Sequence, residues 1–167
     1  YVARFRTALP DSIPIATVSG RYYAMDRDKR WDRVARAYLA MAEGKGPHFA
    51  DAASAIDAAY AAGTTDEFIV PAVIGKYKGM QDGDALLCFN YRADRVRQIF
   101  APLVVPGFGE FPLPRQIKFV AAVGMTRYSD ALAPFMTALF PPQVMHNLLG
   151  QVVAAAGLRP LRMAGTE

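Results

Sequence analysis

Residues 13–28, IPIATVSGRYYAMDRD, contain the pattern that decides the fold of this chain. The apolar, partly β-branched run Ile13–Val18 ends at a Ser-Gly pair and predicts a strand. A loop over Arg21–Arg27 follows. A helix then begins at about Asp28, a good N-cap residue, because apolar side chains over residues 31–42 recur at i, i+3, i+4 and i+7. The chain thus opens with a strand, an arginine-bearing loop and a helix.

The same alternation of strands and helices continues along the chain. The predicted elements are a helix over Asp51–Ala62, a strand over Glu67–Val70, a strand over Ala85–Phe89 buried on both faces, a helical stretch to about Phe100, a Pro/Gly-rich loop over Pro102–Pro114, a strand over Ile117–Val123, a linker around Phe140–Pro142, a helix over Val144–Ala156 and a strand beginning at Leu161. This order predicts an α/β fold, a layered sheet with flanking helices, in which the sheet is mixed or mainly parallel.

Length and composition limit the class of protein. The chain has 167 residues, of which 53% are hydrophobic and 20% charged, so it can form one globular domain and is too apolar to be disordered. Every apolar run is shorter than the roughly 18 residues of a membrane span. The single cysteine, Cys88, excludes a disulfide framework and suits a reducing compartment. Because the chain opens on Tyr1 rather than Met, we expect it to be part of something longer.

The positive charge is mostly arginine. The net charge is +4, and 14 of the 19 basic residues are Arg. Residues 1–36 hold eight basic and four acidic side chains, residues 85–167 hold the same balance, and residues 37–84 hold three basic and seven acidic ones. Two basic regions could therefore meet on one anionic ligand, because arginine binds carboxylate and phosphate bidentately. An ordinary solvated surface explains the composition equally well.

Two arginine loops have the position expected of a ligand site. Residues 19–27 and residues 90–95, NYRADR, each follow an apolar strand and precede a helix, and ligands of α/β sheets bind beyond the carboxyl ends of strands. Arg92 and Arg95 are three residues apart and share one face of the first helical turn. The helix N-terminus adds N–H groups for an anion. The pattern predicts a site for a small ligand that carries a phosphate and a carboxylate.

The residues alone do not predict a catalytic centre. Asp26 and Asp28 could hold a divalent metal, although such acids more often cap a helix or pair with arginine. The sequence has no nucleophile elbow, P-loop, HExxH or CxxC motif. The residue pattern therefore predicts a phospho-anion-binding module without a catalytic centre of its own. A stand-alone phospho-anion- or RNA-binding module without catalysis is the alternative to a part of an enzyme.

Several segments resemble the cofactor-independent (2,3-bisphosphoglycerate-independent) phosphoglycerate mutase family. They are ATVSGRYYAMDRD at 16–28, DEFIVP at 66–71, FNYRADR at 89–95 and the stretch from Gly157 to Glu167. The resemblance implies an isomerase of glycolysis and gluconeogenesis that interconverts 3-phosphoglycerate and 2-phosphoglycerate through a phosphoserine. It also implies an alkaline-phosphatase-like domain with two Mn²⁺ ions, and a phosphotransferase domain inserted in it. The intact enzyme would be cytoplasmic and monomeric, with no nucleic-acid or membrane partner.

By the same resemblance, residues 1–141 would form most of the inserted phosphotransferase domain, incomplete at its N-terminus. Residues 142–167 would be a linker and the first elements of the returning phosphatase domain. The substrate-binding residues would be Arg21, Arg27, Arg92, Ala93, Asp94 and Arg95, with Ala93 standing where the family usually has Pro. The catalytic serine and the metal ligands would lie outside this chain, so we expect the chain alone to be inactive.

Overall fold

The computed structural model describes residues 1–159, and the strand predicted from Leu161 lies outside this range. The elements are α1 (Val2–Ala8), β1 (Thr17–Val18), α2 (Arg21–Ala24), α3 (Trp31–Glu43), β2 (His48–Phe49), α4 (Ala52–Ala61), the 3₁₀ turn η1 (Asp66–Phe68), β3 (Ala72–Ile74), β4 (Ala85–Cys88), the 3₁₀ turn η2 (Ala93–Arg95), α5 (Arg97–Val104), β5 (Ala121–Gly124), β6 (Thr137–Ala138) and α6 (Leu149–Ala155).

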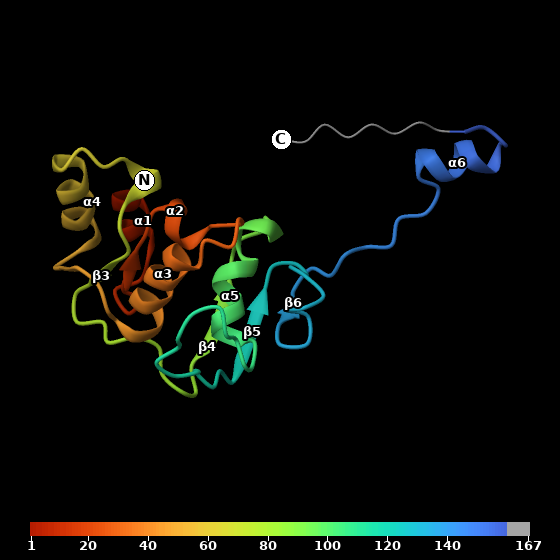
Figure 1. Ribbon diagram of the computed structural model, residues 1–167. Coiled ribbons are helices and arrows are strands. Elements are labelled where there is room, and N and C mark those ends of the chain that lie inside the picture. The colour runs from red at the N-terminus through yellow and green to blue at the C-terminus, as the bar shows by residue number, and fades with distance from the viewer. Residues whose placement is uncertain (160–167) are drawn as a thin grey trace.

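The strands form two small sheets rather than the single sheet expected. The first has the order β1-β3-β2, with β1 antiparallel and β2 parallel to β3. The second has the order β4-β5-β6, and all its strands are parallel. In Figure 1 the first sheet lies with α1–α4 in one half of the body, and the second lies beside α5 in the other half. The α/β class is confirmed, and the mixed pairing belongs to the first sheet alone.

The main core lies between α3, α5 and the second sheet. Val34 and Tyr38 of α3 are almost fully buried and belong to the same apolar cluster as Ile99 and Phe100 of α5. The Tyr38 hydroxyl donates to the Arg115 carbonyl at 2.9 Å. Burial, reinforced by the negative charge of Glu43, raises the pKa of Tyr38 above its ordinary value. The amphipathic pattern of residues 31–42 therefore predicted the buried face of α3 correctly.

The predicted ends of the first helices need correction. The helix expected from Asp28 begins at Trp31 with Arg30 at its N-cap, and it ends at Gly44, as predicted, with a left-handed φ of 61°. The helix over Asp51–Ala62 is confirmed as α4, and Asp51 caps it by accepting a hydrogen bond from the Ser54 N–H. The loop expected over Arg21–Arg27 contains the short helix α2, because Gly20 can serve as its N-cap.

The strand predicted over Glu67–Val70 was wrong. Residues 66–68 form η1, and the strand, β3, begins only after Pro71. Proline has no N–H to donate to a neighbouring strand, so it can stand just before a strand begins as well as just after one ends. Strand β2 was not predicted, because two residues are too few to show an alternating pattern.

The apolar run Ala85–Phe89 is not buried on both faces. Leu86 and Cys88 belong to the core beneath α5, whereas Leu87 and Phe89 are 49% and 74% exposed on the other side of β4. Successive side chains of a strand alternate between faces. A continuous apolar run therefore shows that a strand forms, but not how many of its faces are covered.

The second half of the chain differs from expectation in its element boundaries. Helix α5 continues through Pro102, which is almost fully buried, so the predicted loop begins later. The strand expected from Ile117 forms only over β5, and β6 was not predicted. The linker around Phe140–Pro142 is confirmed as a segment without regular structure. It leads to α6, which lies apart from the body in Figure 1 and is shorter than predicted.

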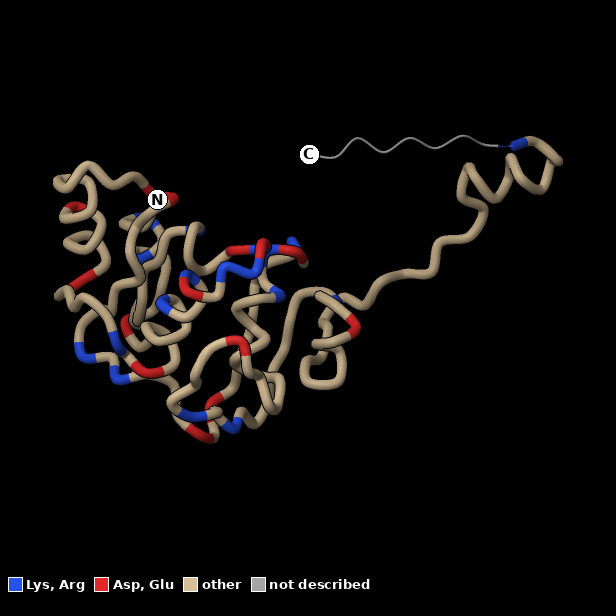
Figure 2. The backbone as a smooth tube through the Cα atoms, viewed as in Figure 1, with Lys and Arg blue, Asp and Glu red and all other residues tan. Residues whose placement is uncertain are grey.

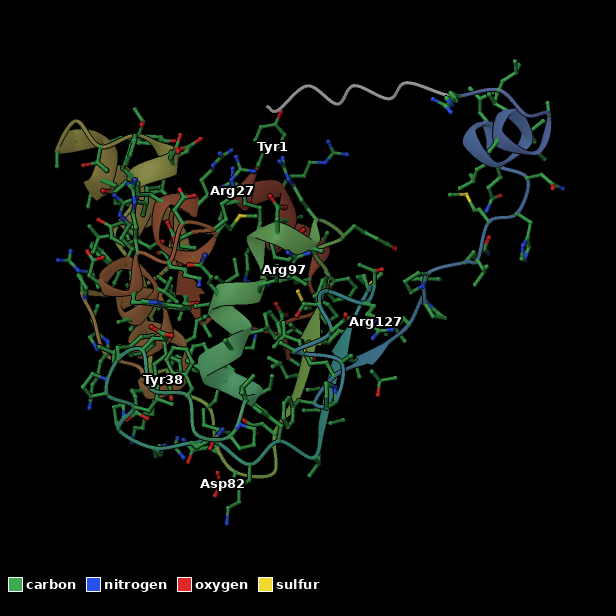
Figure 3. All side chains as sticks on the ribbon, turned by 45° about the vertical axis from the view of Figure 1, so that its right-hand side comes forward. Tyr1, Arg27, Tyr38, Asp82, Arg97 and Arg127 are labelled. Atoms are coloured by element: carbon green, nitrogen blue, oxygen red, sulfur yellow. The ribbon has the colours of Figure 1, made fainter. Side chains whose placement is uncertain are left out.

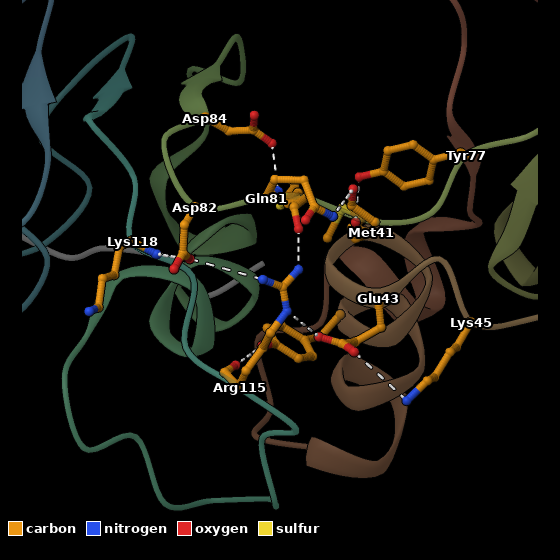
Figure 4. Close-up of polar contacts among 12 residues, drawn as sticks. Met41, Glu43, Lys45, Tyr77, Gln81, Asp82, Asp84, Arg115 and Lys118 are labelled. Carbon is orange, nitrogen blue, oxygen red and sulfur yellow. Dashed lines mark hydrogen bonds and ion pairs between the residues drawn. The ribbon is translucent and has the colours of Figure 1, made fainter.

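Arg115 joins segments from both halves (Figure 4). Its Nε atom lies 3.2 Å from Oε1 of Glu43 at the end of α3, and its Nη2 donates to the Met80 carbonyl. Its Nη1 is 4.0 Å from Oδ1 of Asp82. The Asp82 carboxylate also accepts a hydrogen bond from the Lys118 N–H at 2.9 Å. These contacts hold the connection between β3 and β4, which contains Met80 and Asp82, against the end of α3.

Candidate functional site

The first arginine loop leaves β1 through a glycine that the packing requires. Gly20 donates its N–H to the Ile69 carbonyl at 2.8 Å. A Cβ atom on Gly20 would lie 2.3 Å from the Glu67 carbonyl oxygen and 2.6 Å from the Ile69 nitrogen. Both neighbours are backbone, so no side chain can move to make room. This close approach sets where α2 and the following loop begin.

The loop between α2 and α3 is held by two buried polar side chains. Asp26 is 6% exposed, and its Oδ2 accepts hydrogen bonds from the N–H groups of Asp28 and Arg30, each at 3.0 Å. Lys29 has a left-handed φ of 57°, which is uncommon for a residue with a side chain. The Lys29 N–H donates to Oε1 of Gln98 on α5 at 3.1 Å. Asp26 therefore shapes the turn that contains Arg27.

The second arginine loop leaves β4 and is held by Tyr128. The Tyr128 side chain is buried, and its hydroxyl accepts from the Met125 N–H at 3.1 Å and lies within hydrogen-bonding distance of the Asn90 and Cys88 carbonyls. Burial, together with a hydrogen bond to Cys88, raises the pKa of Tyr128 to about 12. The Arg97 Nε donates to the Tyr128 carbonyl at 2.7 Å. One tyrosine thus connects the end of β5 to the start of this loop.

The two loops meet at Asp94. The Arg27 Nη1 donates to one oxygen of the Asp94 carboxylate at 3.0 Å, and the Arg92 Nε donates to the other at 3.1 Å. The Arg95 Nη1 donates to the Met25 carbonyl at 3.2 Å. In Figure 2 the blue and red stretches of the two loops lie together along the upper edge of the body, and Figure 3 places Arg27 near the start of α5. The prediction that the two loops face one place is confirmed.

The electrostatics of this cluster favour anions. Asp94 is 32% exposed, and partial desolvation works against its ionised form. The hydrogen bonds and charges of Arg27 and Arg92 outweigh that effect and hold the pKa of Asp94 below its ordinary value. Two arginines thus bind one carboxylate that stays ionised, and Arg95 lies nearby on the Met25 carbonyl. Each guanidinium has five N–H donors, so Arg27 and Arg92 keep donors beyond those that bind Asp94 within residues 1–159.

The other predicted site residues have different surroundings. Arg21, the first residue of α2, makes an ion pair with Glu67 at 3.6 Å rather than with Asp94. Ala93 begins η2, and its carbonyl accepts from the Val96 N–H. Arg92 is the N-cap of this 3₁₀ turn and Arg95 is its last residue, so neither opens an α-helix, since α5 begins only at Arg97. The substrate-binding roles of all these residues remain predictions.

The Asp26-x-Asp28 pair forms a turn. The Asp26 carboxylate is bonded to the backbone of Asp28 itself. Within residues 1–159, no group of three or more His, Cys, Asp or Glu side chains is placed to bind a metal ion. The same part of the chain has no helix long and apolar enough to cross a membrane.

The sequence analysis missed Gln98 and Tyr128. Gln98 is on the buried side of α5 among apolar residues, and a buried amide at such a position signals a hydrogen-bonding role. Tyr128 follows β5 in a segment for which no structure was predicted, and the sequence offers no local signal for its hydroxyl contacts. Lys29, the partner of Gln98, is 69 residues away in the sequence, and Asn90, one partner of Tyr128, is 38 residues away.

The fold and the site define an α/β protein in which two arginine loops hold one carboxylate beyond the ends of strands. The chain belongs to the family of the BPG-independent phosphoglycerate mutase N-terminus, because the family model described as "BPG-independent PGAM N-terminus (iPGM_N)" matches residues 1–130. The resemblance seen in the two arginine loops is confirmed.

Relatives agree with this assignment. A "2,3-bisphosphoglycerate-independent phosphoglycerate mutase" of Rhodopseudomonas palustris is 60% identical over 166 residues, which are 99% of this chain and 33% of the relative. The protein of that name from Gluconobacter oxydans is 55% identical over the whole chain and 33% of its own length. Among solved structures, Leishmania mexicana phosphoglycerate mutase, described at low cobalt concentration, matches with a TM-score of 0.71 and 27% identity, covering 93% of this chain and 30% of that one. The chain spans about a third of the length of the curated relatives it matches.

Proposed function

We propose that this chain is the substrate-holding part of a phosphoglycerate mutase that interconverts 3-phosphoglycerate and 2-phosphoglycerate. The observation that carries the proposal is the carboxylate of Asp94, held by Arg27 from one loop and Arg92 from the other. This internal contact supports the proposal, because it aims both guanidiniums at one carboxylate. A phosphoglycerate carries both a carboxylate and a phosphate, which are the groups that arginine binds best. The names of the relatives support the same substrate.

The arginines would act by holding the glycerate during phosphoryl transfer. In the proposed reaction a serine accepts the phosphate, and the glycerate turns before the phosphate returns to its other hydroxyl. A glycerate that stays bound reacts again at high effective concentration, whereas one that leaves allows hydrolysis of the phosphoserine. Arg27, Arg92 and Arg95 would bind the charged groups, and Arg21 would contribute if it exchanges Glu67 for substrate. Asp94 would orient the two guanidiniums.

The proposal assigns the remaining chemistry to other parts of a longer enzyme. We place the serine nucleophile and two Mn²⁺ ions there, since the described residues offer no cluster of metal ligands. Residues 1–141 would belong to the phosphotransferase domain and residues 142–167 to the return into the phosphatase domain. The single buried cysteine suits a cytoplasmic enzyme. We also propose that the intact enzyme is a monomer.

The test uses an exchange enzyme, in which residues 1–167 replace the matching third of the Rhodopseudomonas palustris relative. Arg27→Ala and Arg92→Ala should each lower kcat/KM by roughly 30-fold or more, because a charge-assisted contact is worth about 2 kcal/mol. The matched control is Arg127→Ala, which removes an exposed arginine paired with Asp130 and lying away from Arg27 in Figure 3. Activity within twofold of the parent in Arg27→Ala and Arg92→Ala would refute the proposed function.

A direct titration separates this proposal from the alternative, a stand-alone RNA-binding module. The 167-residue chain should bind 3-phosphoglycerate in preference to short RNA. The mixture of acidic and basic side chains in the two loops disfavours a polyphosphate chain, which needs a continuous basic stripe. Tight RNA binding with a steep salt dependence, together with indifference to 3-phosphoglycerate, would support the alternative instead.

A further inference from the structure

Apart from tyrosines, the buried polar side chains of residues 1–159 lie at one place in the fold. These residues are Asp26, which is 6% exposed, and Gln98, which is 9% exposed. They come from different halves of the body, and both accept hydrogen bonds from the backbone of residues 28–30. These two buried side chains therefore lie behind the loop that presents Arg27.

The Asp26 carboxylate fixes the turn on both sides of Arg27. A single oxygen, Oδ2, accepts the N–H of Asp28 and the N–H of Arg30 at 3.0 Å each. Arg27 lies between Asp26 and Asp28, inside the smaller of these two hydrogen-bonded rings. The direction of its side chain therefore depends on the ring, and this direction brings its Nη1 to Asp94.

Gln98 holds the same turn from the opposite element. Its Oε1 accepts the N–H of Lys29, the residue with a left-handed backbone. A non-glycine residue in that conformation is strained and persists only when its surroundings hold it. The contact joins the turn to α5. Arg92 and Asp94 lie in the segment just before this helix. Asp26 shapes the turn, and Gln98 sets its position against the second arginine loop.

We infer that Asp26 is a positioning residue, which together with Gln98 aligns Arg27 with Asp94 and Arg92 for the anion. The inference rests on the proposed function, because that function supplies the ligand that Arg27 would bind. A buried carboxylate loses hydration, and its hydrogen bonds here go to backbone N–H groups. One oxygen of this side chain accepts both N–H groups, and it is this acceptor that positions Arg27.

The test compares variants of the exchange enzyme. Asp26→Ala removes the acceptor and should lower kcat/KM by roughly 10- to 100-fold, the range expected for a misplaced contact group. Asp26→Asn keeps an oxygen that can accept both N–H groups and should restore kcat/KM to within about threefold of the parent. A role for the negative charge itself, as a metal ligand or a base, predicts instead that Asp26→Asn is as impaired as Asp26→Ala, and that result would overturn the inference.

The double variant Asp26→Ala/Arg27→Ala distinguishes positioning from a general loss of structure. If Asp26 acts through Arg27, the double variant should be no less active than Arg27→Ala alone. Losses that multiply would overturn the inference. If Asp26→Ala does not fold, as judged by circular dichroism, Gln98→Leu replaces it in the same cycle. Near-normal activity of Arg27→Ala would instead refute the proposed function, so the two failures are distinguishable.

Discussion

Replacement of Tyr128 by phenylalanine should destabilise this chain, because the hydroxyl holds the start of the second arginine loop. Tyr128 is 3% exposed and Met125, which donates its N–H to the hydroxyl, is 9% exposed. The same hydroxyl bonds the Asn90 carbonyl. Tyr128→Phe keeps the ring and leaves one N–H and one carbonyl without a partner. The change therefore tests the hydroxyl contacts and not the packing.

The expected loss is about 2 kcal/mol. An unsatisfied buried polar group costs about 1 to 3 kcal/mol, and the half-buried Asn90 carbonyl can recover part of its loss from water. For a domain of this size, the free energy of unfolding falls by about 2 kcal/mol for each molar of urea. The midpoint of Tyr128→Phe should therefore fall by about 1 M at an unchanged slope. Circular dichroism of the 167-residue chain measures this midpoint.

The matched control is Tyr60→Phe. Tyr60 is 52% exposed, and its hydroxyl contacts the exposed Asp66 carboxylate, so water can replace that contact. Its midpoint should stay within about 0.25 M of the parent, since exposed changes of this kind alter stability by less than about 0.5 kcal/mol. Equal shifts in the two variants, or a shift below about 0.3 M for Tyr128→Phe, would refute the role given to Tyr128.

The pH dependence provides a second readout of the same residue. Burial and the hydrogen bond to Cys88 raise the pKa of Tyr128 to about 12, above the value of about 10 for an unfolded chain. The contribution of Tyr128 to stability is therefore complete below pH 10 and is lost as the pH rises from 10 toward 12. The difference in unfolding free energy between the parent and Tyr128→Phe should narrow over this range. A difference that stays constant up to pH 12 would contradict the assignment.

Three further predictions concern other contacts, each measured by urea unfolding. Gly20→Ala should lower the midpoint clearly, because its Cβ would lie 2.3 Å from the backbone carbonyl oxygen of Glu67; an unchanged midpoint would contradict this packing. Asp51→Ala should lower the midpoint at pH 7. The Ser54 N–H holds the pKa of Asp51 below its ordinary value, so this difference should disappear as the pH falls below about 4. Arg115→Ala, which removes side-chain contacts to Glu43 and to the segment of Met80 and Asp82, should cost about 1 kcal/mol, and high salt should reduce that cost.

The arginine loops illustrate how far local sequence determined the site. Strand and helix follow one another in the predicted order, because hydrophobic periodicity and Gly44 act over a few residues. The strand expected over Ile13–Val18 is shorter, at Thr17–Val18, and the loop contains α2. The meeting of the loops was expected from the rule for strand ends in α/β folds. The contact itself joins Arg27 to Asp94, 67 residues apart, and no local pattern contains that pairing.

By itself, the sequence determined the α/β class, the two arginine loops and the family that they resemble. The tertiary structure alone decided that the strands divide into two sheets, that Leu87 and Phe89 are exposed, and that Asp26, Gln98 and Tyr128 hold the loops. The physical reason is the range of the forces involved. Propensity, capping and periodicity act between neighbours in sequence, whereas burial and the choice of hydrogen-bond partner depend on segments that only the folded chain brings together.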